Sequence, residues 1–244
     1  MPPQELATLF ADLATALSTP LEEPVTARLV VRLALEVVPA ADEAALTVPS
    51  RRHRLRVLAS SSDTGRTLEE RQHAAGEGPA LDAVSGTDLV RSDDLAAEPR
   101  WATWTPEAVS HGAACALSLP LLSGTRRAGA LSLYAERVDA FGGPETVEMA
   151  SLYARHAANA MVVARHVTGL ETALESRHMI GMAQGILMTR FGIDEDQSFA
   201  VLRRVSSNQN VKLREVAQHV VDTGELPDAP AGGTMDGAVA EELG

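Results

Sequence analysis

Polar and basic side chains gather in one short stretch near the end of the chain. Arg203 and Arg204 close one helix-like segment, and Asn210, Lys212 and Arg214 follow around a polar break. Guanidinium and ammonium groups hold phosphates, while an amide can read a base edge or a sugar. The spacing predicts one basic rim suited to nucleic-acid recognition. The simpler interpretation is that these charges are only solvated and that Asn210 only caps a helix.

Three helical segments must position this rim, and the first is expected to stop at Gly192. Its apolar residues recur at helical spacing and predict one buried face, formed by Ile180, Ala183, Leu187 and Phe191. Asp194 can then accept hydrogen bonds from the free amides of the next helix, and Gln197 can reach back in a capping box. The second helix is therefore expected to start near Glu195.

The second and third segments carry apolar stripes of their own. The second is expected to bury Phe199, Leu202 and Val205. Asn210 is expected to be the N-cap of the third, whose inward residues are Leu213, Val216, Ala217, Val220 and Val221, with Gly224 and Pro227 at its end. Because three short helices bury little apolar surface, a dimer or a neighbouring domain should support them.

Residues 165–226 resemble an ANTAR domain. The matching positions are Arg177, Ala183-Gln184-Gly185, Leu187-Met188, Phe199, Leu202-Arg203, Ser206, Asn210, Lys212-Leu213 and Val216-Ala217. The resemblance implies an RNA-binding module of transcription antitermination, in which paired domains grip RNA hairpins of a nascent transcript and prevent a terminator from forming. It implies no catalysis. Two positions depart from the pattern, because the family often has Lys in place of Gln184 and Ala in place of Ser198.

With this resemblance, the candidate RNA-binding set gains two residues, Arg177 and Gln184. We expect phosphate contacts from Arg177, Arg204, Lys212 and Arg214, and base-edge or sugar contacts from Gln184 and Asn210, with Arg203 in the same rim. The net charge of the chain is −12, but residues 165–227 hold 7 Lys or Arg against 8 Asp or Glu, whereas residues 1–164 hold 14 against 21. Nonspecific attraction of phosphate should therefore be weak, and recognition local.

Residues 5–160 are predicted to form an α+β domain. Amphipathic segments open it, the first with Leu6, Leu9, Phe10, Leu13 and Leu17, and strand-like runs at 44–48, 55–60, 89–91, 113–122 and 128–134 predict an antiparallel sheet with flanking helices. The order resembles a GAF domain in the Gly76-Glu77-Gly78-Pro79 step, the 94–104 loop, and Ser118-Leu119-Pro120-Leu121 before Gly129-Ala130-Leu131-Ser132-Leu133. The resemblance implies a sensory or dimerisation role and leaves an unidentified small-molecule ligand open.

No residue cluster of this domain predicts catalysis. The single cysteine, Cys115, lies in an apolar strand, where a free Cys is usually a small core residue, and the seven histidines lack metal-binding spacing. Trp101 and Trp104 could cover a ligand pocket, but the favoured interpretation is that they cover the sheet. We expect no enzymatic activity, no metal and no cofactor.

A connecting helix is predicted over residues 144–176. Ala160, Val163, Val167, Leu170 and Leu174 alternate at spacings of 3 and 4, the pattern of a coiled-coil seam, although the same stripe could pack on the sheet. We hypothesise a parallel homodimer in which the ligand state of the GAF-like domain changes the pairing of this helix. That change would alter the spacing of the RNA-binding modules.

The last residues of the chain and its lack of long apolar runs carry two further predictions. Residues 228–244 are rich in Pro, Gly, Ala and acids and predict a disordered tail. No run approaches membrane-spanning length and no signal peptide is recognisable, which with one cysteine predicts a cytoplasmic protein without a membrane partner.

Two other functions stay open. One is a helix-turn-helix DNA-binding regulator, whose recognition helix would present Lys212, Arg214, Glu215, Gln218 and His219. The other is a protein-interaction module without nucleic-acid binding. The RNA target, the ligand and the direction of the switch do not follow from the sequence.

Overall fold

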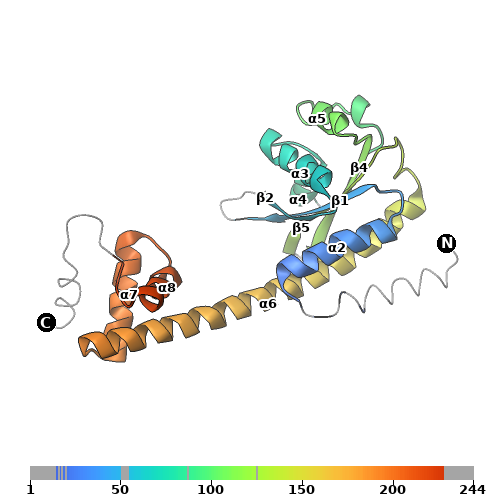
Figure 1. Ribbon diagram of the computed structural model, residues 1–244. Coiled ribbons are helices and arrows are strands. Elements are labelled where there is room, and N and C mark those ends of the chain that lie inside the picture. The colour runs from blue at the N-terminus through green and yellow to red at the C-terminus, as the bar shows by residue number, and fades with distance from the viewer. Residues whose placement is uncertain are drawn as a thin grey trace. The chain divides into compact units, whose positions relative to one another are not determined.

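The computed structural model describes residues 21–50, 55–86, 88–124 and 126–227, together with residues 15, 17 and 19. The chain divides into two compact units, Met1–Thr168 and Gly169–Gly244. Helix α6 (Pro144–Phe191) is 48 residues long and supplies residues to the core of each unit (Figure 1). Positions 6, 9, 10 and 13 of the opening segment, the 51–53 part of the predicted turn and the 228–244 tail lie outside the described residues.

The first unit is built on a five-stranded antiparallel sheet in the order β2-β1-β5-β4-β3. The strands are β1 (Glu43–Pro49), β2 (Leu55–Ser60), β3 (Val90–Ser92), β4 (Cys115–Ser123) and β5 (Arg126–Ala135). The hairpin of β4 and β5 pairs Cys115 with Ala135 and Ser123 with Arg126. These strands and the flanking helices confirm the predicted α+β fold.

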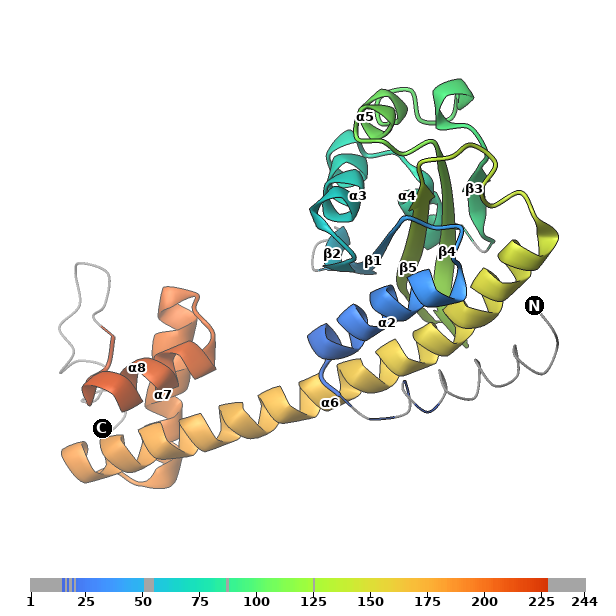
Figure 2. The same cartoon turned by 45° about the vertical axis from the view of Figure 1, so that its right-hand side comes forward.

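Helix α2 (Glu23–Val37) and the first half of α6 cover one face of the sheet (Figure 2). Alternate residues of the central hairpin point to this face, as the two-residue period of a strand requires: Cys115, Leu117, Leu119, Leu121, Leu131, Leu133 and Ala135. Tyr153 of α6 lies among them, and its hydroxyl donates to the Val30 carbonyl oxygen at 2.6 Å. This apolar layer fixes the first half of α6 to the sheet.

Three helices cover the opposite face: α3 (Asp63–Ala75), α4 (Pro79–Ser85) and α5 (Thr105–Ser110), with the 3-10 turn η2 (Leu95–Ala97) beside them. Gly76 ends α3 in the left-handed region, with φ 72°, and Gly78 begins α4 with φ 138°. A Cβ atom at Gly78 would overlap the Gln72 side chain. The turn from α3 to α4 therefore needs glycine at this position.

The second unit consists of the end of α6 with α7 (Glu195–Gln209) and α8 (Leu213–Thr223). Its buried apolar core is formed by Ala183, Leu187, Ile193, Val201, Leu202, Val205, Val216, Ala217, Val220 and Leu226. The predicted all-α three-helix module is confirmed. Across the described residues, no helix combines the length and the apolar character needed to span a bilayer.

Candidate nucleic-acid interface

The connection between α6 and α7 follows the predicted cap signals. Gly192 takes the left-handed conformation directly after Phe191, with φ 68°. The Asp194 carboxylate accepts from the Gln197 backbone N–H at 2.8 Å, and the Gln197 side chain accepts from the Asp194 N–H at 3.0 Å. This capping box confirms that α7 starts at Glu195.

The buried stripe of α7 differs from the predicted one at Phe199. That ring is 40% exposed, whereas Val201 is 1% exposed and occupies the core with Leu202 and Val205. The reason is Ser198, which is fully buried: it donates to the Glu195 carbonyl oxygen at 2.8 Å and accepts from the Gln184 side chain of α6 at 3.3 Å. With Ser198 facing α6, the next residue along the helix turns outward. The expectation of a buried Phe199 was wrong.

Asn210 caps the end of α7 and not the start of α8. It adopts the left-handed conformation, with φ 54°, and its backbone N–H donates to the Ser206 and Ser207 carbonyl oxygens. Lys212 holds the N-cap position of α8 without a side-chain capping bond. The prediction of an Asn210 N-cap was therefore wrong, because Asn tolerates the left-handed conformation that a helix end needs as readily as it serves as an N-cap.

Most of the predicted basic residues lie on the two helices that flank the turn between α7 and α8. Arg203 is exposed and Arg204 half-buried in the second half of α7, and Lys212 and Arg214 are exposed at the start of α8. Lys212 Nζ lies 3.7 Å from the Glu215 carboxylate, a weak surface pair. The Asn210 side chain is exposed at the turn itself. These side chains lie on the two helix segments that flank the turn, and we name this set the α7–α8 corner.

The two candidates on α6 have different surroundings. Arg177 is exposed, seven residues before Gln184 and thus on the same side of the helix. Gln184 is half-buried, and its amide nitrogen donates to the Glu195 carbonyl oxygen at 3.0 Å as well as to Ser198. The Gln184 amide nitrogen is thus engaged within the module, where it holds α7 against α6.

A shallow groove of about 250 Å³ lies between α6 and the start of α8. Glu175, Ser176 and Met179 line it from α6, and Arg214, Glu215 and Gln218 line it from α8. The two carboxylates offset the Arg214 charge on this side. The groove therefore does not extend the basic surface of the α7–α8 corner.

In the first unit, the two tryptophans lie inside the protein. Trp101 and Trp104 are 2% and 1% exposed, with ring centroids 5.9 Å apart in an edge-on arrangement, and Trp104 lies 6.3 Å from the Tyr134 ring. Their indole N–H groups donate to the Asp82 carboxylate at 2.9 Å and the Leu68 carbonyl oxygen at 3.0 Å. The rings fill the space between the sheet and its helices, which agrees with the favoured interpretation.

The loop that carries the tryptophans is held by carboxylates. Glu77 accepts from the Thr103 and Trp104 backbone N–H groups at 2.5 and 3.0 Å. The Arg100 guanidinium lies over the Trp101 ring at 4.3 Å and pairs with Glu98 at 2.6 Å. This hydrogen-bonded pairing lowers the pKa of Glu98 to about 2. The loop is thus a fixed part of the core.

A buried hydrogen-bond network lies beside these rings, and sequence reasoning missed it. The fully buried Glu69 accepts from Thr47 Oγ1 and from the Tyr134 hydroxyl, each at 2.7 Å. Gln72 donates to the Tyr134 hydroxyl at 2.5 Å and accepts from the Ala80 N–H at 2.8 Å. Burial, followed by the Glu69 charge, raises the pKa of Tyr134 well above its usual range, so the phenol stays a donor. The only advance signal was Glu69 and Gln72 at the i, i+3 spacing of one helix face.

Comparison with known proteins identifies both units. The GAF domain family matches residues 20–162, which is more than half of the 244 residues. The chain belongs to the GAF domain family. The ANTAR domain family matches residues 168–221. The ANTAR domain is known as an RNA-binding output domain of transcription antitermination, and in this chain an ANTAR domain follows a GAF sensor domain. No curated protein matches the chain.

Solved structures share the fold of the GAF domain at low sequence identity. The GAF domain of an Acinetobacter phosphoenolpyruvate-protein phosphotransferase aligns with a TM-score of 0.54 and 15% identity, over 68% of this chain and 98% of that one. Its counterpart from Coxiella burnetii aligns with a TM-score of 0.53 and 17% identity, over 67% and 96%. A bacteriophytochrome from R. palustris aligns with a TM-score of 0.55 and 13% identity, over 84% of this chain and 47% of that one.

The GAF domain buries its cysteine and shows no metal-binding cluster among the described residues. Cys115 Sγ donates to the Arg137 carbonyl oxygen at 3.1 Å, and burial raises the pKa of the thiol. A raised pKa disfavours the reactive thiolate. These features fit the expectation of a core residue.

Helix α6 exposes an apolar stripe. In its GAF part, Ala160 is buried and Val163 is 48% exposed, while in its ANTAR part Leu170 and Leu174 are 67% and 66% exposed. Ala160, which was predicted to belong to a seam, packs within the GAF domain, so the exposed stripe starts at Val163. Large apolar side chains that recur at this spacing on an exposed helix face are typical of a surface for another helix.

Proposed function

We propose that this protein is an RNA-binding regulator of transcription antitermination, in which the GAF domain controls a dimeric ANTAR domain that binds paired RNA hairpins. The observation that carries the proposal is the ANTAR match over residues 168–221, on three helices that expose cations at the α7–α8 corner. The near-neutral charge of residues 165–227, 7 basic against 8 acidic, favours recognition through few local contacts.

Each exposed side chain of the corner has a role in this proposal. Arg203, Lys212 and Arg214 contact phosphates, and the exposed Asn210 contacts a base edge or a sugar. Phe199, exposed on the preceding helix, is a candidate for stacking on an unpaired loop base. Gln184 acts indirectly, because its amide nitrogen holds Glu195 and Ser198.

Dimerisation through α6 is the second part of the proposal. Val163, Leu170 and Leu174 leave apolar surface in water, and a second copy of the helix in parallel would cover it at a gain of about 25 cal/mol per Å² removed from water. The pairing would place two ANTAR domains on one RNA. It would also let the GAF domain act on both of them through the same helix pair.

Binding to matched nucleic acids tests the RNA part. The purified protein is titrated with a two-hairpin RNA, a single-hairpin RNA and duplex DNA across a salt series, beside the double variant Lys212→Ala with Arg214→Ala. We expect preference for the two-hairpin RNA, a loss of about tenfold or more in the variant, and a salt slope reduced by about 1 to 2. The control variant Arg66→Ala with Arg155→Ala removes two exposed cations of the GAF domain and should bind like the parent.

The other outcomes distinguish the alternatives. Preference for duplex DNA would support the helix-turn-helix regulator, and absence of nucleic-acid binding at every salt concentration would support a protein-interaction module. Sedimentation tests the dimer separately, with Leu170→Glu and Leu174→Glu together as the variant that should dissociate it. A parent protein that is monomeric at concentrations where RNA is bound would refute the dimer.

A further inference from the structure

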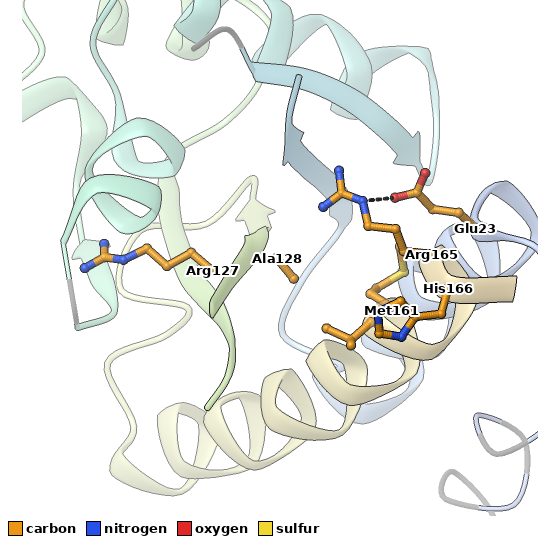
Figure 3. Close-up of a pocket in the computed structure, with 7 residues that line it drawn as sticks. Glu23, Arg127, Ala128, Met161, Arg165 and His166 are labelled. Atoms are coloured by element: carbon orange, nitrogen blue, oxygen red, sulfur yellow. Dashed lines mark ion pairs between the residues drawn. The ribbon is translucent and has the colours of Figure 1, made fainter. Parts of the chain in front are cut away.

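A pocket lies on the face of the GAF domain that α2 and α6 cover. Its volume is about 260 Å³, slightly below the 300 to 1,000 Å³ that is usual for drug-sized ligands. Ala128 of β5 and Met161 and Val162 of α6 form its apolar part, and Glu23, Arg127, Arg165 and His166 complete its lining (Figure 3). It is separate from the opposite face of the sheet, which Trp101 and Trp104 fill.

The charges around this pocket do not balance. The Glu23 carboxylate, 13% exposed, is shared between Arg165 Nε at 3.5 Å and Arg56 Nη2 at 3.2 Å. Arg127 also lines the pocket, but its guanidinium extends away from Ala128 in Figure 3 and donates to the Val84 and Gly86 carbonyl oxygens. Two guanidiniums, those of Arg165 and Arg56, thus share one carboxylate, in a part of the chain where residues 1–164 hold 14 basic against 21 acidic residues.

We infer that this pocket binds a small organic monoanion, a carboxylate carried on a short apolar body. Arg165 is half exposed and its Nε lies 3.5 Å from the Glu23 carboxylate, an ion-pair distance that is long for a hydrogen bond, so its guanidinium can take a second carboxylate. His166, exposed beside it, adds a hydrogen-bond donor. Ala128, Met161 and Val162 cover the apolar body and disfavour a fully hydrated anion such as phosphate.

The position of the pocket gives the ligand a route to the output. Glu23 is also tied to α6 through its backbone N–H, which donates to Thr168 Oγ1 at 2.8 Å at the end of the GAF unit. A ligand that competes with Glu23 for Arg165 therefore acts on the residue that fastens this end of α6. This regulatory consequence rests on the proposed function, whereas binding itself does not.

Titration of the full chain without RNA tests the inference. The probes are hexanoate, the neutral hexanamide and inorganic phosphate, followed by calorimetry or ligand-observed NMR. We expect saturable binding of hexanoate, weakened about tenfold or more by loss of the charge in hexanamide or in Arg165→Gln. Val162→Phe, which fills the pocket from a half-buried position, should weaken binding as well. Arg155→Gln, an exposed arginine of α6 outside the pocket, should bind like the parent.

Three results would overturn the inference: no saturable hexanoate binding, hexanoate binding that Arg165→Gln and Val162→Phe both retain, or phosphate binding as tight as hexanoate binding. If Arg165→Gln alone failed to fold, as judged by circular dichroism, Val162→Phe and hexanamide would still decide. Because no RNA is present, these results are independent of whether the ANTAR domain binds hairpins.

Discussion

Glu69 and Gln72 of the GAF domain are fully buried, whereas Lys212 and Arg214 of the ANTAR domain are exposed. The buried pair is bonded to Tyr134, Thr47 and Ala80, so its polar groups hold α3 and α4 on the sheet. The exposed pair lies where a partner can reach it. Sequence polarity alone does not separate these roles, and burial decides between a structural and a recognition function.

The cores of the two domains differ as well. The GAF domain packs apolar residues on both faces of its sheet, whereas the described part of the ANTAR domain has one small cluster shared by three helices. A small domain buries a lower fraction of its surface and tolerates less loss. One truncation should therefore affect the whole ANTAR domain but only one layer of the GAF domain.

The largest effect is expected from Leu202→Ala. Leu202 is fully buried at the centre of the ANTAR core, and its truncation should cost about 2 to 5 kcal/mol. Calorimetry with hydrogen exchange should show the ANTAR domain melting earlier while the GAF transition stays in place. Met182→Ala, at an exposed position of α6, is the control and should change little. Equal shifts of both domains would mean that they unfold as one unit.

The second-largest effect is expected from Glu69→Ala, which should lower the free energy of unfolding of the GAF domain by about 2 to 4 kcal/mol. The change leaves the Thr47 and Tyr134 hydroxyls without their buried acceptor. Glu70→Ala, the exposed neighbour on the same helix, is the matched control and should lie within about 0.5 kcal/mol of the parent. Chemical denaturation followed by tryptophan fluorescence measures both. Equal stability of the two variants would show that the network is not structural.

The Glu98–Arg100 pair predicts a dependence of GAF stability on pH. The folded pKa of Glu98 is lowered from 4.5 to about 2, so its stabilisation is fully present above pH 4.5 and is lost as pH falls toward 2. We expect the pair to stabilise the GAF domain by about 1 to 2 kcal/mol, a value reduced for solvent screening because the Arg100 side chain is half exposed. Glu98→Gln should remove this component from a denaturation series across pH 2 to 5. An unchanged profile in that variant would contradict the assignment.

Gln184→Ala should have the smallest effect and lower the free energy of unfolding of the ANTAR domain by about 0.5 to 1.5 kcal/mol. The variant removes the hydrogen bonds to the Glu195 carbonyl oxygen and Ser198 Oγ. Gln184→Glu keeps the size of the side chain but lacks the amide donor, and should lose as much. If Gln184→Ala weakened RNA binding with no change in stability, Gln184 would contact RNA directly.

Local signals predicted the fold better than they predicted the site. The Asp194–Gln197 capping box, the Gly192 stop and the alternation along β4 each depend on neighbouring residues, and each appears in the structure. Phe199 and Asn210 were misplaced because their positions depend on how α7 meets α6 and on whether a polar residue ends one helix or starts the next. Both questions are settled by tertiary contacts.

The buried network could not be predicted for the same reason. Thr47, Glu69 and Tyr134 lie on three separate elements and are far apart in sequence. Charged residues are usually exposed, so Glu69 reads as a surface residue until its partners are known. Interestingly, the two departures from the ANTAR pattern, Gln184 and Ser198, are bonded to each other. Where the family often has a positively charged Lys, this chain has Gln184, whose side chain forms a hydrogen bond inside the domain.

Helix α6 also has a consequence for how the chain folds. Starting a helix is the unfavourable step, because several residues are ordered before the first turn closes, whereas each later residue adds one hydrogen bond. The GAF core already holds the first half of α6 through Tyr153, Ala157 and Met161. As synthesis proceeds from the N-terminus, the first helix of the ANTAR domain can therefore grow from an existing template. We expect the isolated ANTAR segment to form that helix poorly, and the GAF domain to act as its folding nucleus.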